Sequence, residues 1–220
     1  MRLGELLGSG RSADVYAIDD DRVLRRYRLP VDAGREAAVM EYVGAHGYPV
    51  PDVYPGAERP TDLVMRRLTG PTMLRALMEG EIVPEEVGEI LARLLLRLHE
   101  IPARASGDPH DRVLHLDLHP DNVLLTPDGP MVIDWCDSRE GPPGQDCAMS
   151  ALIVAQVAVD EESDLAAPAR LVLGALLAGL GAAMDCGDGL EQARRRRGAN
   201  QTLTARELGL LDSAVTLVRT

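Results

Sequence analysis

The most informative features of this sequence are two amino acids that it lacks. Its 220 residues include no phenylalanine and no lysine, so all 23 basic side chains are arginines. A Schiff base needs a side-chain amine, which excludes that mechanism. The phosphate-binding lysine of a Walker A loop is excluded for the same reason. Any recognition of phosphate or carboxylate must therefore use arginine, backbone N–H groups or a metal ion.

Positive charge and cysteine are also scarce. The chain has 35 acidic residues and a formal net charge of −12, which argues against broad binding to nucleic acid or to anionic membranes. Cys136, Cys147 and Cys186 are widely spaced and form no C-x-x-C pair. This spacing argues against a disulfide framework or a zinc site and favours a reducing, cytoplasmic environment.

Long apolar runs are missing as well. Residues 1–10 contain no run long enough for a signal peptide. The longest apolar stretch, residues 171–184, is interrupted by three glycines and is shorter than the ~20 residues of a membrane helix. We therefore expect it to be a buried core helix, and we expect no membrane partner.

The first third of the chain predicts a small sheet with one helix. On this helix, Asp32 is the expected N-cap, and Glu36 shares one face with Val39, Met40 and Val43. Four prolines within residues 48–60 indicate a loop. The short apolar runs that predict strands are residues 3–7, 14–18, 22–27 and 62–68.

Beyond Gly70 the pattern changes to that of long helices. We expect helices at residues 147–159 and 165–184, the second interrupted near Pro168, and a last helix that opens with a capping box at Thr204. Leu208, Leu211, Val215 and Val218 would share one face of that last helix. An earlier helix is indicated by a stripe of period 3.6 formed by Val83, Val87, Ile90, Leu91, Leu94, Leu95, Leu98 and Ile101. The change predicts an α+β protein with a β-rich lobe over residues 1–68 and a larger helical lobe over residues 69–220.

Three polar side chains in the middle of the chain point to a chemical site. From residue 114 to residue 119 leucines alternate with His115, Asp117 and His119, so the polar groups are expected on one side. Asn122 follows, and an apolar hairpin then leads directly into Asp134. We expect Asp117, Asn122 and Asp134 to lie close together, and such oxygen donors suit Mg²⁺.

Two other interpretations of these residues remain open. Asp117 and Asn122 alone could be turn residues that cap neighbouring segments. A metal hydrolase built on His115, Asp117 and His119 would need a further ligand at suitable spacing, and His46, His99 and His110 form no such pattern.

The segment HLDLHPDN at residues 115–122, followed by IDW at residues 133–135, resembles the aminoglycoside phosphotransferase family of the protein-kinase-like fold. The resemblance extends from the N-terminal glycine-rich loop to about Asp146 and is weaker over the last 70 residues. It implies a two-lobed α+β fold, with a small antiparallel sheet and one helix in the N-terminal lobe and a larger, mainly helical C-terminal lobe. Many relatives have glycine at the position of Leu116.

The resemblance also implies a role for each matching residue. Asp117 would orient and deprotonate the acceptor hydroxyl, while Asn122 and Asp134 would hold Mg²⁺ on the nucleotide phosphates. Asp146 would brace the catalytic loop, and His115 would support it.

The nucleotide would be bound by the N-terminal lobe. Gly8, Gly10 and Ser12 belong to a glycine-rich loop whose N–H groups would contact phosphates, with Ala13 in place of the third glycine of the kinase pattern. The same residues also fit the G-x-G-x-x-A pattern of a dinucleotide-binding site. That alternative, an oxidoreductase, requires a helix after the glycines, whereas residues 15–18 indicate a strand.

Arg25 stands where the family has its phosphate-anchoring lysine, and Glu36 is its expected ion-pair partner. Arginine is bulkier and planar, so it is not an equivalent substitute. The alternative is that Arg25, Arg26 and Arg28 form a solvated strand edge. Adenine would bond to the backbone of the segment that joins the lobes, where we select Arg66 and Leu68.

The resemblance predicts that ATP or GTP donates its γ-phosphate, with Mg²⁺, to a hydroxyl of an aminoglycoside-like molecule or metabolite. The alternative is a non-catalytic pseudokinase, which Arg25 and Ala13 favour. The acidic residues 160–164 and the arginines 194–197 could contact an acceptor or face solvent. A monomer is favoured, although no feature decides the oligomeric state.

Overall fold

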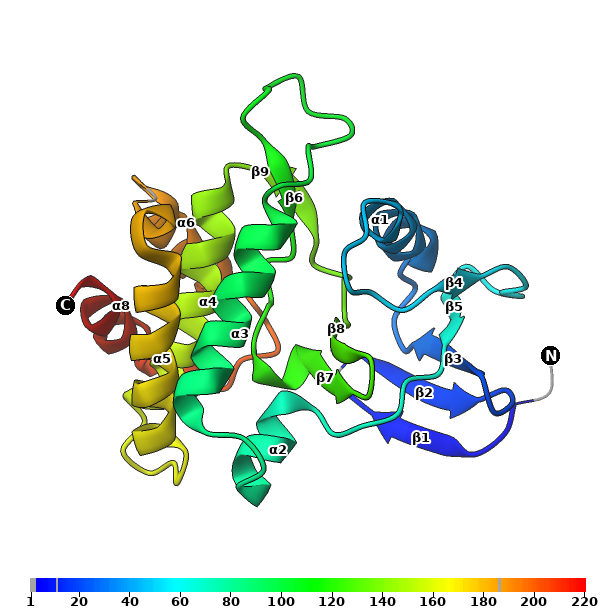
Figure 1. Ribbon diagram of the computed structural model, residues 1–220, viewed down its shortest axis with the longest axis horizontal. Coiled ribbons are helices and arrows are strands. Elements are labelled where there is room, and N and C mark those ends of the chain that lie inside the picture. Colours follow the sequence, from blue (N-terminus) through cyan, green and yellow to red (C-terminus); the bar gives the residue numbers. More distant parts are fainter. Residues whose placement is uncertain (1–2, 11, 186) are drawn as a thin grey trace. The chain divides into compact units, whose positions relative to one another are not determined.

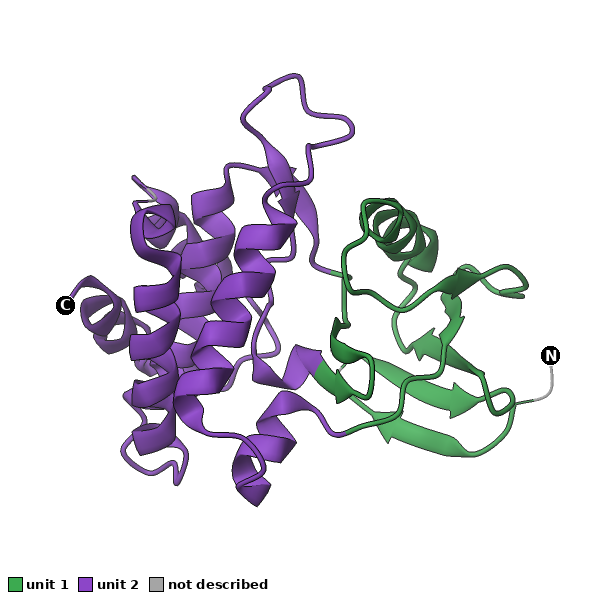
Figure 2. Cartoon of the chain, viewed as in Figure 1, with its two compact units in different colours: residues 1–70, 124–136 green, residues 71–123, 137–220 purple. Residues whose placement is uncertain are grey.

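The computed structural model describes residues 3–10, 12–185 and 187–220, so Arg11 of the glycine-rich loop and Cys186 lie outside the described residues (Figure 1). The chain forms two compact units (Figure 2). Unit 1 comprises Met1–Gly70 and Leu124–Cys136, and unit 2 comprises Pro71–Val123 and Asp137–Thr220. The hairpin segment that precedes and includes Asp134 therefore belongs with the N-terminal sheet.

Unit 1 is built on an antiparallel sheet with the strand order β1-β2-β3-β5-β4. The central strand, β3, begins and ends where the sequence predicts, whereas β1 begins three residues later than residue 3. A short strand, β4, lies in the proline-rich segment that we expected to be a loop. Its pairing with Val64 and Met65 makes it an edge strand, where neighbouring prolines are tolerated. The strands are β1 (Leu6–Ser9), β2 (Ala13–Ala17), β3 (Arg22–Tyr27), β4 (Val53–Tyr54) and β5 (Asp62–Arg66).

One helix and one hairpin complete unit 1. Helix α1 (Ala33–Ala45) begins as predicted at Asp32, whose side chain accepts the N–H of Gly34, and its face carrying Glu36 is buried. The hairpin of β7 (Val123–Thr126) and β8 (Gly129–Val132) turns at Gly129, where φ is +109°. A hydrogen bond of 2.9 Å from Val132 N–H to Pro49 O ties the hairpin to the segment after α1.

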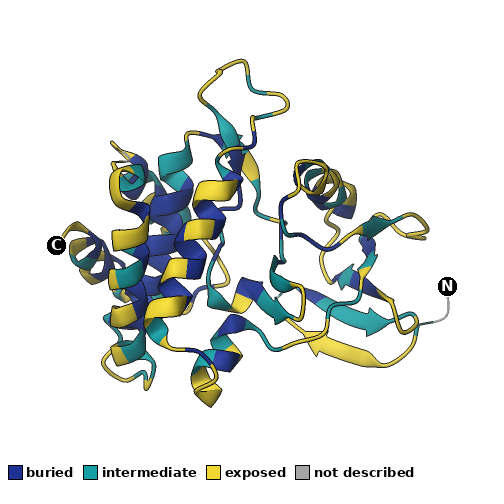
Figure 3. Ribbon diagram, in the orientation of Figure 1, coloured by how far each residue is buried: buried dark blue, intermediate teal, exposed yellow. Residues whose placement is uncertain are grey.

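Unit 2 is a helical bundle around α4. This helix is buried along most of its length (Figure 3), and α5, α6 and α8 pack against it while α3 packs against α5. The short strands β6 (Arg112–Leu114) and β9 (Arg139–Gly141) pair beside it. The helical segments are α2 (Met73–Glu79), α3 (Pro84–Leu98), η1 (Pro120–Asn122), α4 (Pro143–Ala158), α5 (Ala166–Leu180), η2 (Gly181–Met184), α6 (Gly189–Gly198), α7 (Ala205–Gly209) and α8 (Leu211–Arg219).

Several local predictions are corrected by the structure. Pro168 does not interrupt α5, because it lies in the first turn, where a missing N–H breaks no helical bond. The capping box at Thr204 is present but opens only the short α7, and Leu208 lies on the exposed surface. Val83 is the exposed N-cap of α3 rather than part of its buried stripe. His115 is fully buried like its leucine neighbours, so the alternation of sides fails there.

The described residues contain one helical run, Ala166–Met184, whose 19 residues are long and apolar enough to cross a membrane by length and composition. This run is longer than the apolar stretch that the sequence indicated, because the structure continues it through the segment around Pro168. Its residues Val172, Leu173 and Leu176 are buried, and the helix packs against α3 and α4.

Helices α3 and α5 approach each other closely at glycines. A Cβ atom placed on Gly88 would lie 2.4 Å from the carbonyl oxygen of Val172, which is backbone and cannot rotate away. On α5, a Cβ on Gly179 would lie 2.7 Å from Cβ of Ala92. Both glycines therefore allow α3 and α5 to pack more closely than any larger residue would permit.

We predict that Gly88→Ala lowers the free energy of unfolding by about 2 kcal/mol, because overpacking the interface outweighs the ~1 kcal/mol gain in helix propensity. Urea unfolding provides the measurement. The matched control is Gly174→Ala in α5, where a Cβ would meet nothing within 4 Å; it should raise stability by up to ~1 kcal/mol. Equal effects of the two substitutions would contradict the prediction.

Candidate active site

The loop after β6 is anchored by one buried carboxylate. Asp146, in the first turn of α4, accepts the backbone N–H groups of His115 at 2.9 Å and Leu116 at 2.7 Å. The ring of His99 lies 3.1 Å from the same carboxylate. Burial by itself acts to raise the pKa of Asp146, but the contacts with His99 and His115 hold that pKa below its ordinary value. The carboxylate therefore stays ionised and holds the loop in place.

Two non-glycine residues among those described have left-handed backbone conformations; one directly precedes the predicted base and the other is a predicted metal ligand. Leu116 has φ +62° and Asp134 has φ +63°. This region is unfavourable for side chains with a Cβ and is usually occupied by glycine. The conformation of Leu116 gives a physical reason for the glycine at this position in many relatives. It also stores local strain immediately before Asp117.

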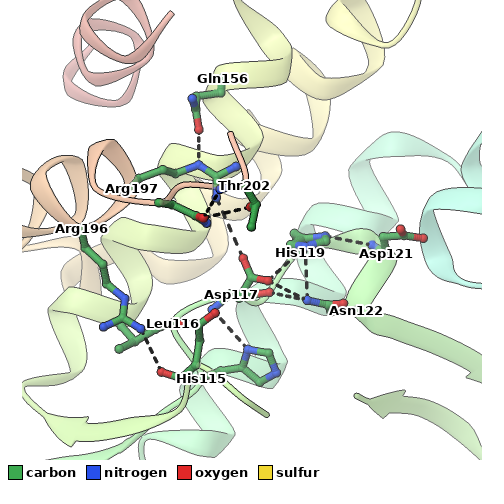
Figure 4. A network of polar contacts seen from close by, with 12 residues as sticks. His115, Leu116, Asp117, His119, Asp121, Asn122, Gln156, Arg196, Arg197 and Thr202 are labelled. Carbon is green, nitrogen blue, oxygen red and sulfur yellow. Dashed lines mark hydrogen bonds and ion pairs between the residues drawn. The ribbon is translucent and has the colours of Figure 1, made fainter. Parts of the chain in front are cut away.

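Asp117 and Asn122 lie together in unit 2 (Figure 4). The side-chain amide nitrogen of Asn122 donates to the carbonyl oxygen of Asp117 at 2.8 Å and lies 3.2 Å from its Oδ2. His119 is also close, with Nε2 at 3.7 Å from the same carboxylate. Because Asp117 uses the amide nitrogen, the Oδ1 atom of Asn122 is left to serve as an oxygen donor for another partner.

A cation that sequence reasoning did not connect with Asp117 lies beside it. The Nη1 atom of Arg197 in α6 is 4.0 Å from Oδ1 of Asp117, as Figure 4 shows. The same guanidinium donates from Nε to the side-chain oxygen of Gln156. Arg197 is far from Asp117 in the sequence and is the last of four consecutive arginines, so no local pattern marks it.

In unit 1, Arg25 forms the ion pair with Glu36 that the sequence predicts. The Nη1 atom of Arg25 is 3.0 Å from Glu36, and its Nη2 atom is 2.5 Å from Asp134. Glu36 also accepts hydrogen bonds from the hydroxyl of Tyr27 and, at 2.9 Å, from the N–H of Trp135. One buried carboxylate thus joins α1, β3 and the segment that carries Asp134.

The charges in this cluster support one another. Burial opposes the charge on Arg25, but Glu36 and Asp134 together raise the pKa of Arg25 above its ordinary value. Burial raises the pKa of Glu36, while Arg25 and the donors from Tyr27 and Trp135 oppose that shift. Because Arg25 is buried and remains charged, the interpretation of this residue as part of a solvated strand edge is wrong.

The glycine-rich loop between β1 and β2 is open on the side of its glycines. A Cβ on Gly8 would meet nothing within 4 Å, and one on Gly10 only the carbonyl oxygen of Ala13 at 3.5 Å. Packing within the loop therefore does not require a glycine at either position, although the N–H of Gly10 already donates to the carbonyl oxygen of Ala13 at 2.9 Å. The carbonyl oxygen of Ser12 accepts the N–H of Arg28 at 3.0 Å.

The segment that follows the glycines rules out the dinucleotide interpretation. Residues Ala13–Ala17 form β2 rather than a helix. Arg28, which the alternative interpretation placed at a solvated strand edge, is half-exposed. Its Nη2 atom nevertheless bonds to Ser9 at 2.6 Å and to Asp14 at 2.5 Å. The loop is thus bonded to the residue that directly follows β3.

Arg66 and Leu68, the two residues predicted to bind adenine, differ in the hydrogen bonds that their backbone groups make. The N–H of Arg66 donates to the carbonyl oxygen of Asp52 at 2.8 Å, and its side chain pairs with Asp128. Leu68 makes no backbone hydrogen bond within the described part of the chain. Leu68 therefore offers free backbone groups to a base, whereas the N–H of Arg66 does not.

No group of three or more His, Cys, Asp or Glu side chains is placed to hold a metal ion among the residues that the structure describes. The predicted ligands are instead one amide, Asn122 in unit 2, and one carboxylate, Asp134 in unit 1. That these two residues meet Asp117 in a single site stays a prediction.

The strand–helix arrangement and the anchored loop with its aspartate are those of a kinase-like phosphotransferase. A model of the phosphotransferase enzyme family (APH) matches residues 4–113 and 105–190, and the chain belongs to this family. No curated protein matches the chain.

Solved structures share the fold over nearly the whole chain. An aminoglycoside phosphotransferase in complex with gentamicin is 14% identical, with 100% of this chain and 91% of that chain covered and a TM-score of 0.59. A choline/ethanolamine kinase family protein from Mesorhizobium loti is 17% identical, with 100% and 89% covered and a TM-score of 0.58. An ADP-bound aminoglycoside phosphotransferase is 14% identical, with 99% and 94% covered and a TM-score of 0.56. The predicted two-lobed α+β fold is confirmed.

We predict that Asp146→Asn lowers the free energy of unfolding by about 3 kcal/mol near neutral pH, because one amide cannot accept all of the donors around it. The pKa of Asp146 is depressed in the folded state. Its contribution is therefore present above the ordinary carboxyl pKa and is lost as pH falls through the lower folded value.

Urea unfolding at several pH values tests this prediction. The difference between the wild type and the variant should shrink as pH falls below about 4. Asp212→Asn is the control, because this exposed carboxylate pairs only at the surface with Arg194 and should change stability by less than ~1 kcal/mol. A difference that stays constant down to acid pH would contradict the role assigned to Asp146.

Proposed function

We propose that this protein transfers the γ-phosphoryl group of ATP or GTP to a hydroxyl group of a small molecule. The observation that carries the proposal is the carboxylate of Asp117. It is held by Asn122 at the end of a loop that the buried Asp146 anchors. The side chain of Asp117 is 31% exposed, so an acceptor hydroxyl can reach it.

Asp117 acts as the base. It accepts a hydrogen bond from the acceptor hydroxyl, orients its oxygen toward the γ-phosphorus and takes the proton as the new bond forms. Arg197 and His119 lie within 4.0 Å of the carboxylate and limit the orientations it can adopt. The strained backbone of Leu116 holds Asp117 at the turn of the loop.

Asn122 and Asp134 are proposed to hold Mg²⁺. The Oδ1 atom of Asn122 and the carboxylate of Asp134 are hard oxygen donors of the kind this ion prefers, and the amide nitrogen of Asn122 is already engaged by Asp117. When bound, Mg²⁺ offsets charge on the nucleotide phosphates. Both ligands are positioned by their own units, through Asp117 in one and Arg25 in the other.

Arg25 takes the place of the missing lysine in this proposal. It is held by Glu36 and contacts Asp134 directly, so it would bring positive charge to the phosphates beside the metal site. Gly8 and Ser12 would contribute backbone N–H groups to the same phosphates, as would Gly10 once its N–H leaves the carbonyl oxygen of Ala13. The free backbone of Leu68 would bind the base. These contacts do not select between ATP and GTP.

One observation favours the second candidate, a nucleotide-binding protein without catalysis. The 2.5 Å contact between Arg25 and Asp134 occupies a carboxylate that the catalytic proposal assigns to Mg²⁺. A cation fixed there competes with the metal ion for the same oxygen. Nucleotide binding without turnover of any hydroxylated compound would support this candidate.

We predict that Asp117→Asn reduces kcat by about 10²–10⁴-fold, because the amide cannot take the hydroxyl proton. Nucleotide binding should persist, because Asp117 does not contact the nucleotide in the proposal. Release of ADP or GDP measures turnover, and thermal unfolding with nucleotide measures binding. Asp164→Asn, an exposed carboxylate of the same unit, is the control and should leave both unchanged. Retained turnover in Asp117→Asn would refute the mechanism.

We also predict that Arg25→Lys raises kcat several-fold while lowering stability. A lysine amine cannot span Glu36 and Asp134 with the two arms of a guanidinium, so Asp134 becomes available to Mg²⁺. Arg26→Lys is the matched control, because this neighbour on β3 pairs with Asp62 and should not affect turnover. The measurement is nucleotide consumption at saturating Mg²⁺, and unchanged kcat and nucleotide affinity in Arg25→Lys would show that the position does no anchoring.

A further inference from the structure

The four consecutive arginines of α6 divide into two pairs. Arg194 and Arg195 form ion pairs with surface carboxylates, and their side chains are 38% and 73% exposed. Arg196 and Arg197 are turned into unit 2, where 30% and 14% of their side chains are exposed. The run is therefore not uniformly a solvated basic face.

The two inner arginines both extend from α6 toward the segment that contains Leu116 and Asp117. Arg197 approaches the carboxylate of Asp117, and Arg196 contacts Asp137 at 2.7 Å and lines a cavity that Leu116 also lines. Figure 4 shows Arg196 and Arg197 on one helix, with Arg197 joined to Asp117 and Leu116 near Arg196. Asp117, the proposed base, follows Leu116 directly in the chain and does not itself line the cavity.

This cavity in unit 2 has a volume of about 190 Å³. That is smaller than the ~300–1,000 Å³ of pockets that enclose drug-sized ligands. It suits a ligand of a few heavy atoms rather than a multi-ring compound. The lining residues that bear on ligand chemistry are Leu116, Arg139, Gln145, Met149, Gln192 and Arg196.

The polar groups available in the cavity are mostly donors. The side chains of Arg139 and Gln145 make no hydrogen bond or ion pair within the described part of the chain. Glu140 also lines the cavity, but its carboxylate is occupied by the backbone N–H groups of Arg104, Ala105 and Ser106. A ligand therefore meets unpaired positive charge beside a carboxylate that is already satisfied.

Acidic residues that could attract a cation are engaged elsewhere. Asp160 and Glu162, in the acidic run before α5, both pair with Arg206. Neither lines the cavity next to Leu116. The lining of this cavity, with Arg139 and Arg196 beside the single carboxylate of Glu140, thus disfavours a polycationic acceptor, even though the chain as a whole carries a net charge of −12.

We propose, building on the proposed function, that the acceptor is a small hydroxylated molecule with a carboxylate or phosphate group, which Arg139 and Arg196 bind while its hydroxyl lies at Asp117. In the reaction, the acceptor oxygen forms a bond to the γ-phosphorus as the bond from that phosphorus to the β–γ bridging oxygen breaks. The hydroxyl proton goes to Asp117. The products are a phosphate ester that still carries its anionic group and the nucleoside diphosphate.

A matched set of glycerol-sized probes tests this assignment. Glycerate carries a carboxylate, glycerol 3-phosphate a phosphate, glycerol no charge and 1,3-diamino-2-propanol two amines. Binding to the full chain is measured by titration without nucleotide, and turnover is measured separately as nucleotide consumption. At least one anion should bind about tenfold more tightly than glycerol or the diamine, as expected for a charge-assisted hydrogen bond. The comparison of the two anions identifies the group.

Arg139→Gln should weaken binding of the preferred anion by about tenfold, because it removes an unpaired guanidinium. Arg196→Gln should have the same effect, with its folding checked by urea unfolding because it also loses Asp137. Arg195→Gln is the matched control, since this exposed arginine lies on the same helix and pairs with Glu191; it should bind the anion like the wild type.

The inference is overturned if neither anion binds up to its solubility limit, if the diamine binds as tightly as the anions, or if Arg139→Gln has no effect. Turnover of aminoglycosides together with any of these results would overturn the acceptor class and leave the phosphotransferase proposal standing. Anion binding that depends on Arg139, without turnover of any hydroxylated compound, would instead overturn the proposed reaction and leave the anion site standing.

Discussion

The geometry of the catalytic loop depends on the buried carboxylate of Asp146. A charge removed from water must find donors inside the protein or lose its ionised form. Asp146 finds them in His99 and in two successive backbone amides, those of His115 and Leu116. Because both amides are turned toward one side chain, the chain folds sharply at this point, and the next residue, Asp117, is directed away from the core.

Unit 1 follows the same physical rule with a different residue. Glu36 is buried on α1 and collects donors from Arg25, Tyr27 and the backbone of Trp135. Its position therefore determines where the cation of β3 and the segment around Asp134 meet. In each unit, a buried carboxylate that does no chemistry itself positions the group that is proposed to do it.

The features that could be predicted from the sequence are those with a local or periodic cause. Asp32 caps α1, and the apolar stripe of α3 is buried, because capping and periodicity act within a few residues. The Arg25–Glu36 pair was also predictable, since a carboxylate on an apolar face needs a partner. The hairpin before Asp134 was expected from its turn residues, although its membership of unit 1 was not.

The features that escaped prediction arise from contacts between distant segments. Arg197 and Asp117 lie on different elements, and nothing near either residue marks the other. The left-handed backbone of Leu116 accompanies its hydrogen bond to Asp146 on helix α4, and a leucine in the sequence gives no sign of this conformation. From the sequence, Gly88 is simply a residue that destabilises a helix. Its close contact with Val172 on α5 explains why a glycine stands at this position.

The arginine at position 25 also determines which reagents can act on this protein. Apart from the histidines, every basic side chain is a guanidinium, which remains protonated at any accessible pH. A guanidinium is a much poorer nucleophile than a neutral amine. Electrophiles that capture the nucleotide-site amine of lysine-containing kinases find no side-chain target within these 220 residues. Acetylation or ubiquitination of lysine likewise has no acceptor within these residues. The activity of this chain therefore cannot be regulated by modification of its lysines.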